Sequence, residues 1–291
     1  MSTIKKVPAG AGAEWLLGAF ALLRKAPLAL GSLGLIWGLL SMLAVQAMAL
    51  NASVGMFLQL ALAILAPLLF AGMLWAVSEV DQGRPALPAH LFRALRSEQS
   101  GSLLATLLPQ LAAAAVLGFL LFAMIGADGF QQLREVMGKL QETAQAGGQP
   151  DPELMRSLPV GRLFLWMLML FAAVIVVSLV TFVAVPDIVF GGSRGFAAMR
   201  NSLRACLHNL LAMLVFYVLL FIAFFMMSFG IQLLSMAVQL VAGPNAGMWV
   251  SNLLLMAVLM PMMAGAVFHA WRQMLGGDVA AAPTAQTHLE A

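Results

Sequence analysis

The sequence predicts an all-α polytopic membrane protein with six transmembrane helices. Of its 291 residues, 62% are hydrophobic and only 9% are charged, and its mean hydropathy is +0.96. A soluble domain of this length needs far more charged surface to stay in solution. Apolar runs of about 20 residues recur, and each can cross the roughly 30 Å hydrocarbon layer of a bilayer as a helix. These runs are continuous rather than alternating, which excludes the pattern typical of a transmembrane barrel.

The apolar runs also delimit the domain. The fifth run is longer than one crossing needs, which indicates a tilted or projecting helix. Ala47-Met48-Ala49 resembles a signal-peptide cleavage site, but the apolar stretch before it is too long for a signal peptide, so we expect the first span to be retained. We predict one membrane domain over 1–277 and a disordered cytoplasmic tail over 278–291. The predicted spans are 27–50, 54–78, 102–126, 160–185, 209–240 and 246–270.

The positions of the basic residues predict the orientation. Most of the 15 Lys and Arg residues lie in the N-terminal segment, in the loops after the second and fourth spans, and at the C-terminal end. Because loops rich in Lys and Arg stay in the cytoplasm, we expect both termini on the cytoplasmic side of the membrane and the 127–159 loop on the opposite side. No basic segment is interleaved with aromatic residues, so no nucleic-acid partner is expected. Cys206 is the single cysteine, which excludes an internal disulfide.

A short pattern, F-x-x-[LM]-R, occurs three times before a pair of spans: at 20–24, 92–96 and 196–200. The second interval between copies is longer than the first by about the length of the 127–159 segment. We therefore predict three pseudo-repeats, each an interfacial helix followed by a two-span hairpin. The units run from about 13–84, 89–188 and 194–277, with 127–159 inserted in the second. The alternative is chance, since Phe, Leu and Arg are common at membrane interfaces.

The third copy indicates what these helices do. Phe196, Met199, Leu203 and Leu207 recur at helical spacing and form an apolar stripe, with basic residues on the adjacent face. Such a helix is expected to lie in the headgroup layer, where guanidinium groups contact anionic phosphates. The alternative is that the basic residues only enforce topology or pair with Glu79, Asp81, Glu98 and Asp187. The predicted lipid-headgroup contacts are Arg24, Lys25, Arg93, Arg96, Arg200 and Arg204.

Two stretches of the sequence resemble known families. Residues 186–209 carry a proline, a glycine-containing turn and then a helical pattern with Ser202 and Asn209 at its fixed polar positions. The pattern is A-h-x-x-S-h-x-h-h-x-x-N, where h is a hydrophobic residue and x is any residue. This resembles uncharacterised bacterial inner-membrane proteins, the YciC-like family and the glycerophosphoryl diester phosphodiesterase membrane-domain proteins. Residues 7–28 are similar to the start of a proteobacterial subset. The resemblance implies a six-span protein of the bacterial inner membrane with no settled activity, which places the 127–159 loop in the periplasm. No catalytic residues are carried over from the second family, because its enzymatic domain is a separate soluble unit.

The spans offer little catalytic chemistry. Charged residues are absent from their centres, and the neutral polar residues are most simply interhelical hydrogen-bonding groups. A polar path lined by Gln59, Gln110 and Gln232 is the alternative. No metal-binding or cofactor-binding motif is present, so neither a cofactor nor an enzymatic activity is expected. Gly34 and Gly38 form a GxxxG spacing, which favours internal packing over a dimer contact.

The 127–159 segment combines an amphipathic stripe with turn residues. Its apolar positions recur at helical spacing, and Asp151-Pro152 is typical of the start of a second short helix. We expect the amphipathic helix and this second short helix to lie on the outer leaflet or to contact a partner. The stripe is formed by Phe130, Leu133, Val136, Met137 and Leu140.

Two functional hypotheses follow. The first is a non-enzymatic accessory or scaffold protein whose partners are anionic membrane lipids, with a protein partner or a second copy of the chain as a further possibility. The alternative is a facilitator of lipidic or apolar cargo without ion coupling, because the spans lack the buried carboxylate that coupled transport uses. A groove between the hairpins favours the second hypothesis, and a tightly packed bundle favours the first.

Overall fold

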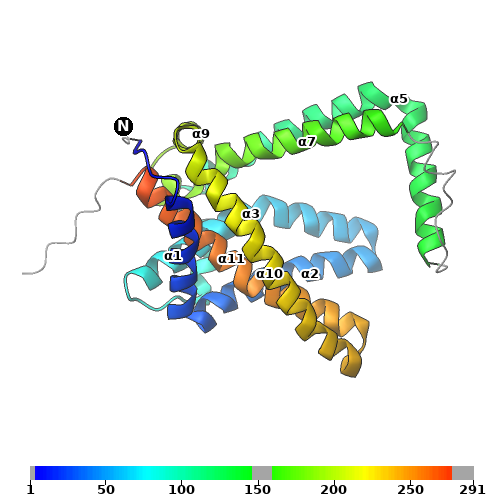
Figure 1. Ribbon diagram of the computed structural model, residues 1–291. Coiled ribbons are helices and arrows are strands. Elements are labelled where there is room, and N and C mark those ends of the chain that lie inside the picture. The colour runs from blue at the N-terminus through cyan, green and yellow to red at the C-terminus, as the bar shows by residue number, and fades with distance from the viewer. Residues whose placement is uncertain (1–3, 146–158, 277–291) are drawn as a thin grey trace, which may run out of the picture. The chain divides into compact units, whose positions relative to one another are not determined.

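Figure 1 shows the computed structural model of the chain, in which residues 4–145 and 159–276 are described. These residues form helices and connecting segments without a β-strand, and six of their helices are long and apolar enough to cross a membrane. The predicted all-α polytopic fold is confirmed. The predicted tail over 278–291 and the short helix after Asp151 lie outside the described residues. The helices are α1 (Ala11–Lys25), α2 (Pro27–Leu50), α3 (Ala52–Asp81), the 3₁₀ helix η1 (Pro88–Arg96), α4 (Ser100–Ala105), α5 (Leu108–Gln145), α7 (Val160–Thr181), α8 (Ala184–Val189), α9 (Gly195–His208), α10 (Leu210–Ala242) and α11 (Pro244–Met274).

Turn residues set the ends of the long helices. Pro27 occupies the first turn of α2, where its missing N–H costs no hydrogen bond. The side chain of Asn51 caps α3 by accepting hydrogen bonds from the backbone N–H groups of Ser53 (3.0 Å) and Val54 (3.1 Å). Gly243 has a φ of 86°, which ends α10 and lets α11 start at once. These signals join the helices of two hairpins with very short loops.

The third and fourth predicted spans are each broken near one end. The third span was predicted to run unbroken from 102, but α4 stops at Ala105 and α5 begins at Leu108. Pro109 cannot donate a hydrogen bond back to the preceding turn, and the hydroxyl of Thr106 donates to the carbonyl of Leu103 at 2.6 Å. In the fourth span, the N–H of Val183 donates to the hydroxyl of Ser202 (3.1 Å), which separates α7 from α8.

The structure divides the chain into two compact units, where the sequence predicts one domain. The first unit holds the described residues up to Leu107 and those from Val180 onward, and the second holds those within 108–179. In the first unit, α11 packs against α1, α2, α3 and α10. An aromatic cluster fills part of this core, with ring centroids 5.9 Å apart for Trp15 and Phe216 and 5.4 Å apart for Phe182 and Phe216.

Small residues allow the helices of the first unit to approach closely. A Cβ atom added to Gly34 of α2 would collide with the carbonyl oxygen of Met256 and lie 2.7 Å from the Cα of Ala257, both on α11. A Cβ atom on Gly38 would lie 3.1 Å from the Cβ of Met256. The GxxxG spacing therefore serves packing between α2 and α11, as predicted.

The second unit is a hairpin of α5 and α7. The first half of α5 ends at Gly126, whose φ of 69° breaks the helix where the sequence predicts the third span to end, and the helix bends there (Figure 1). Trp166 of α7 donates its indole N–H to the carbonyl of Leu117 at 2.9 Å, and Arg162 donates to the carbonyl of Met124 at 2.9 Å. Beyond the break, Val136 is buried whereas Phe130 and Met137 are exposed, so the predicted apolar stripe is only partly covered.

Candidate functional site

The three copies of the F-x-x-[LM]-R pattern lie in α1, η1 and α9, which all belong to the first unit. Each of these short helices precedes a pair of long helices in the chain. They contact one end of the unit, formed by the last turns of α3 and α11, by α8 and by the start of α10. This end carries the basic residues predicted to contact lipid headgroups, so its side chains define the candidate site.

Helix α1 packs by one face and leaves the other open. Trp15 is fully buried and donates its indole N–H to the side-chain oxygen of Gln273 at 2.8 Å, which ties α1 to the end of α11. Phe20 is 37% exposed on the opposite face. Arg24 and Lys25 are exposed beside it. The helix therefore presents an aromatic ring and two positive charges outside the bundle.

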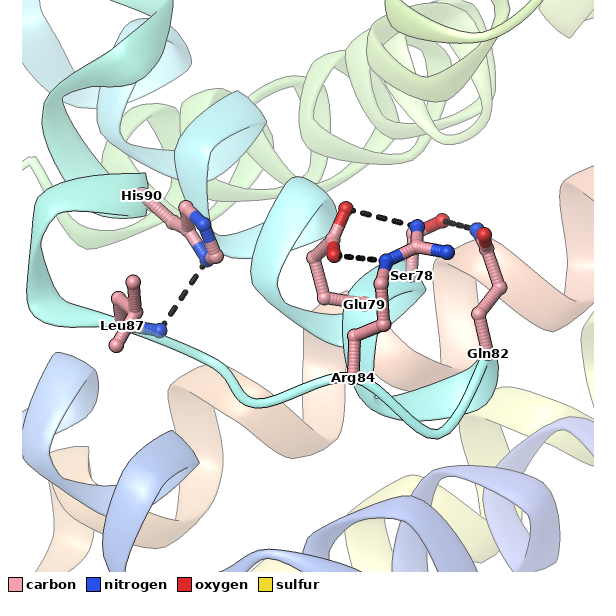
Figure 2. A network of polar contacts seen from close by, with 6 residues as sticks. All are labelled: Ser78, Glu79, Gln82, Arg84, Leu87 and His90. Atoms are coloured by element: carbon pink, nitrogen blue, oxygen red, sulfur yellow. Dashed lines mark hydrogen bonds and ion pairs between the residues drawn. The ribbon is translucent and has the colours of Figure 1, made fainter.

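The loop between α3 and η1 contains its own polar network (Figure 2). Glu79 and Arg84 form an ion pair with two contacts, one of 3.0 Å between Arg84 Nη2 and Glu79 Oε1. The hydrogen bond that Arg84 donates to the Glu79 carboxylate raises the pKa of the Arg84 guanidinium above its ordinary value, so this exposed group remains charged. Gln82 donates to the hydroxyl of Ser78 (3.0 Å), and the N–H of Leu87 donates to His90 Nδ1 (3.2 Å). These contacts fix the segment that leads into η1.

In η1 the two predicted headgroup residues differ. The guanidinium carbon of Arg93 lies 4.1 Å from the centroid of the Trp75 ring, a cation–π geometry. Arg96 is exposed at the last residue of the helix. Phe92, the aromatic residue of this copy, is 43% exposed. Arg93 therefore has an internal partner in Trp75, whereas Arg96 is exposed and has no ion pair within the described chain.

Helix α9 is buried by its small residues rather than by the predicted apolar stripe. Ala198, Ser202 and Cys206 are fully buried, because α4 and α8 approach this face closely. Of the predicted stripe, Met199 is 6% exposed, but Phe196 is 70% and Leu207 50% exposed. The prediction that these residues share one face toward the membrane is therefore wrong for Met199, which faces the protein.

The two fixed polar residues of the family-like pattern have structural roles. Ser202 accepts the hydrogen bond from Val183 that separates α7 from α8. Asn209 accepts a hydrogen bond from the N–H of Val7 (2.8 Å) and donates to the carbonyl of Lys5 (3.1 Å). The pattern thus holds α9 and the N-terminal segment in place, and it contributes to the site by positioning rather than by chemistry.

The acidic residues considered as partners for the headgroup residues are mostly engaged elsewhere. Asp81 pairs with Arg272 at 2.6 Å, and Glu79 pairs with Arg84. Asp187 is 2% exposed and accepts hydrogen bonds from Asn201 (3.0 Å) and Trp271 (3.4 Å). Asp187 was expected only as a partner for the basic residues, and its burial was not predicted; the available signal was its place after Pro186 at the end of a span, before a Gly-Gly turn.

Consequently none of the six predicted headgroup residues has an ion pair within residues 4–145 and 159–276. Arg93 stacks on Trp75, and the other five have no cation–π partner there either. All six are exposed. Internal pairing therefore does not account for them in the described structure. The five are Arg24, Lys25, Arg96, Arg200 and Arg204.

Two surface grooves in the described part of the chain contain headgroup residues. One, of about 520 Å³, lies where α1 meets α2 and includes Arg24. The other, of about 510 Å³, lies between α9 and the N-terminal segment and includes Arg204 and His208 beside Ile4 and Leu207. Both combine apolar and cationic side chains, as an amphiphilic anion requires.

The remaining candidates do not form a reactive centre. Gln59, Gln110 and Gln232 are all exposed on their helices, so they do not form a buried polar path within either unit. No cluster of three His, Cys, Asp or Glu residues suited to a metal ion occurs among the described residues. Comparison of the chain with protein-family models, with curated proteins and with solved structures returns no match.

Proposed function

We propose that this chain is a non-enzymatic accessory or scaffold protein of the bacterial inner membrane, anchored at its cytoplasmic face by anionic lipids. One observation carries the proposal: α1, η1 and α9 carry exposed basic residues that have no ion pair among the described residues, beside the exposed rings of Phe20, Phe92 and Phe196. Aromatic and basic side chains on one interfacial helix suit the boundary between acyl chains and anionic headgroups. Each such Arg or Lys contributes about 1 kcal/mol to binding of an anionic membrane surface.

The arrangement of charge supports a cytoplasmic location for this end of the first unit. The segment before α2, the connection from α3 to α4 and the turn before α9 hold most of the basic residues of the described chain. Lys and Arg near the ends of spans favour the cytoplasmic side. In this proposal both termini are cytoplasmic and the segment after Gly126 is periplasmic.

Close packing supports a scaffold rather than a transporter. Gly12, Gly34 and Gly72 each have backbone atoms of a neighbouring helix where a Cβ atom would lie, so these contacts leave no room between the helices. The acidic residues on the long helices of the first unit, Glu79 and Asp81, lie at the end of α3 and not in its middle. The buried Asp187 lies on the short helix α8, where Asn201 and Trp271 donate hydrogen bonds to it. Ion-coupled transport normally needs an ionisable group within the membrane.

The resemblance of 186–209 to uncharacterised inner-membrane families agrees with this proposal. Ser202 and Asn209, the polar residues that carry the resemblance, hold α9 against α8 and the N-terminal segment. Polar residues that hold an interfacial helix in place suit a membrane-anchored accessory protein. We therefore propose membership of this group of six-span proteins.

The proposal is tested with charge-matched variants. Arg200→Gln/Arg204→Gln removes two unpaired charges, and Arg84→Gln/Arg272→Gln removes two charges that are already paired with Glu79 and Asp81. Native mass spectrometry of the proteins from membranes containing phosphatidylglycerol should show reduced lipid retention for the first variant only. Equal retention in both variants and the wild type contradicts the proposal. Movement of labelled phospholipid between leaflets by the purified protein would instead support a facilitator of lipidic cargo.

A further inference from the structure

The groove at the junction of α1 and α2 results from the way the two helices are joined. Helix α1 ends at Lys25, Ala26 leaves the helical conformation with φ −140° and ψ 62°, and Pro27 begins α2. This one-residue elbow leaves the outer side of the last turns of α1 uncovered. The groove measures about 520 Å³ and is lined by Leu17, Phe20, Ala21, Leu23, Arg24 and Pro27.

The two faces of α1 differ sharply in burial. Trp15, Ala19 and Leu22 on the inner face are at most 3% exposed. On the groove side, Leu17 is 67% exposed although it is a large apolar residue of the same helix. Exposed apolar side chains that line a groove are suited to a hydrocarbon chain rather than to water.

The charge at this groove is also uncompensated. Arg24 is the one polar side chain among the six lining residues. It has no ion pair in the part of the chain that the structure describes, unlike Arg84 and Arg272. A guanidinium group binds phosphate oxygens through two parallel hydrogen bonds. Arg24 therefore favours a ligand that carries a phosphate group over a ligand that is wholly apolar.

We infer that this groove binds one anionic phospholipid, with an acyl chain along Leu17, Phe20 and Leu23 and the headgroup phosphate on Arg24. Pro27, the first residue of the span α2, lines the groove beside Arg24, so a phosphate bound by Arg24 lies near the elbow between the two helices. The inference rests on the proposed function and names one site of it. The apolar lining selects a lipid over a free phosphate, which Arg24 alone would bind.

Adjacent residues provide the matched test. Arg24 lines the groove, whereas Lys25 is equally a cation, is exposed and is not among the lining residues. If the lipid is attracted only by the overall positive charge of the surface, Arg24→Gln and Lys25→Gln should cause the same loss of binding, about fivefold. A direct hydrogen-bonded contact predicts a loss of at least about tenfold for Arg24→Gln alone.

A third variant tests the groove without changing charge. Ala21 is exposed and lines the groove, so Ala21→Phe fills it while α1 keeps its buried face. Binding of phosphatidylglycerol, phosphatidylcholine and soluble glycerol phosphate to the full chain is titrated by native mass spectrometry. We expect Arg24→Gln and Ala21→Phe to lose phosphatidylglycerol, Lys25→Gln to lose less, and glycerol phosphate not to compete. Thermal stability, measured in parallel, should be unchanged in all three variants.

Each other outcome has a defined meaning. Equal losses for Arg24→Gln and Lys25→Gln, with wild-type binding by Ala21→Phe, overturn the groove as a site but leave the proposed anchoring by surface charge intact. Competition by glycerol phosphate overturns the lipid assignment in favour of a free phosphate ligand. Equal binding of phosphatidylglycerol and phosphatidylcholine by the wild type overturns the proposed function itself.

Discussion

At the level of single residues, the basic side chains of the first unit differ by what they contact. Arg84 and Arg272 pair with Glu79 and Asp81, and Arg93 stacks on Trp75. Arg24 and its counterparts on α9 have no such partner in the described chain. Residue type alone does not separate these groups, because each consists of arginines near the end of a span. The partner is set by where the turns and neighbouring helices bring the carboxylates.

Two buried polar residues at this end of the first unit, Asp187 and Asn209, have neutral hydrogen-bond partners. Asp187 accepts hydrogen bonds from Asn201 and Trp271, and Asn209 binds the backbone of the N-terminal segment. Buried polar atoms generally need such partners, because leaving one unpaired costs about 1–3 kcal/mol. These residues therefore stabilise the end of the unit on which the headgroup residues lie.

Cys206 provides a test at this scale. The thiol is fully buried in α9, and burial raises its pKa to about 12, because the charged thiolate is disfavoured there. Maleimide reacts with the thiolate, so labelling in the folded protein at pH 8 should be slower by on the order of a thousandfold than for an exposed thiol. Reaction should begin only as the pH approaches the raised pKa or when the protein unfolds.

The measurement is simple because Cys206 is the single cysteine. Mass spectrometry after labelling in mild detergent should find unmodified protein, and labelling in sodium dodecyl sulfate should go to completion. Rapid labelling at pH 8 in mild detergent would show that α9 is not packed against its neighbours as described.

At the level of elements, the packing of helices depends on small residues at a few contacts. Gly34 of α2 and Gly195 of α9 illustrate this: a Cβ atom on Gly195 would lie 2.8 Å from the carbonyl oxygen of Ser102 on α4. In a membrane, where apolar surface gains little by leaving lipid, close van der Waals contact is a main source of helix association. The glycines therefore set how near the helices come.

Gly34→Ala is expected to destabilise the first unit. The added Cβ atom would overlap the backbone of Met256 and Ala257, so α2 and α11 must separate, at a cost of about 1–3 kcal/mol. Thermal unfolding in detergent, followed by size-exclusion chromatography after heating, measures the effect. Gly118→Ala is the control, because Gly118 lies on α5 with nothing within 4 Å of its Cβ position. A variant at Gly34 as stable as that at Gly118 would contradict the described α2–α11 contact.

The sequence predicts most of the elements because hydropathy and turn chemistry are local. Continuous apolar runs locate the spans, and Pro27, Asn51 and Gly126 mark their ends. The break between α7 and α8 was missed, because its hydroxyl partner, Ser202, comes from another helix. A contact between distant segments leaves no periodic signal in either one.

The candidate site was predicted by residue type but not by geometry. Hydrophobic periodicity placed Met199 on an outward stripe of α9, whereas the helix buries it together with Ala198 and Ser202. Hydrophobic periodicity identifies the most apolar face of a helix. It does not reveal that a face with small residues lets a neighbouring helix pack closely and so becomes buried. The groove beside Arg24 was also not predicted, because it depends on the single-residue elbow at Ala26, which hydrophobic periodicity does not reveal.

For the whole molecule, the six spans differ in how much of their apolar surface the protein itself covers. In the most apolar stretches of α2, α3 and α11, 44%, 50% and 44% of the residues are buried. The corresponding share is 17% for α10, 11% for the span containing α5 and 22% for the span containing α7. Since the bilayer solvates apolar side chains, these exposed surfaces are compatible with spans that contact lipid over most of their length. The division into two units does not test the predicted threefold repeat, which stays a prediction.

The predicted orientation is tested by placing single thiols on the two sides of the membrane. Asp128 follows the break at Gly126, and Pro85 lies between α3 and η1; both residues are exposed. In a Cys206→Ala background, a membrane-impermeant maleimide applied to intact spheroplasts should label Asp128→Cys and leave Pro85→Cys unlabelled. The reason is that the basic loop around Pro85 is retained in the cytoplasm, whereas the segment after Gly126 is translocated. Lysed spheroplasts are the control, and both variants should be labelled there. The opposite pattern in intact spheroplasts would invert the orientation, and with it the assignment of α1, η1 and α9 to the cytoplasmic leaflet.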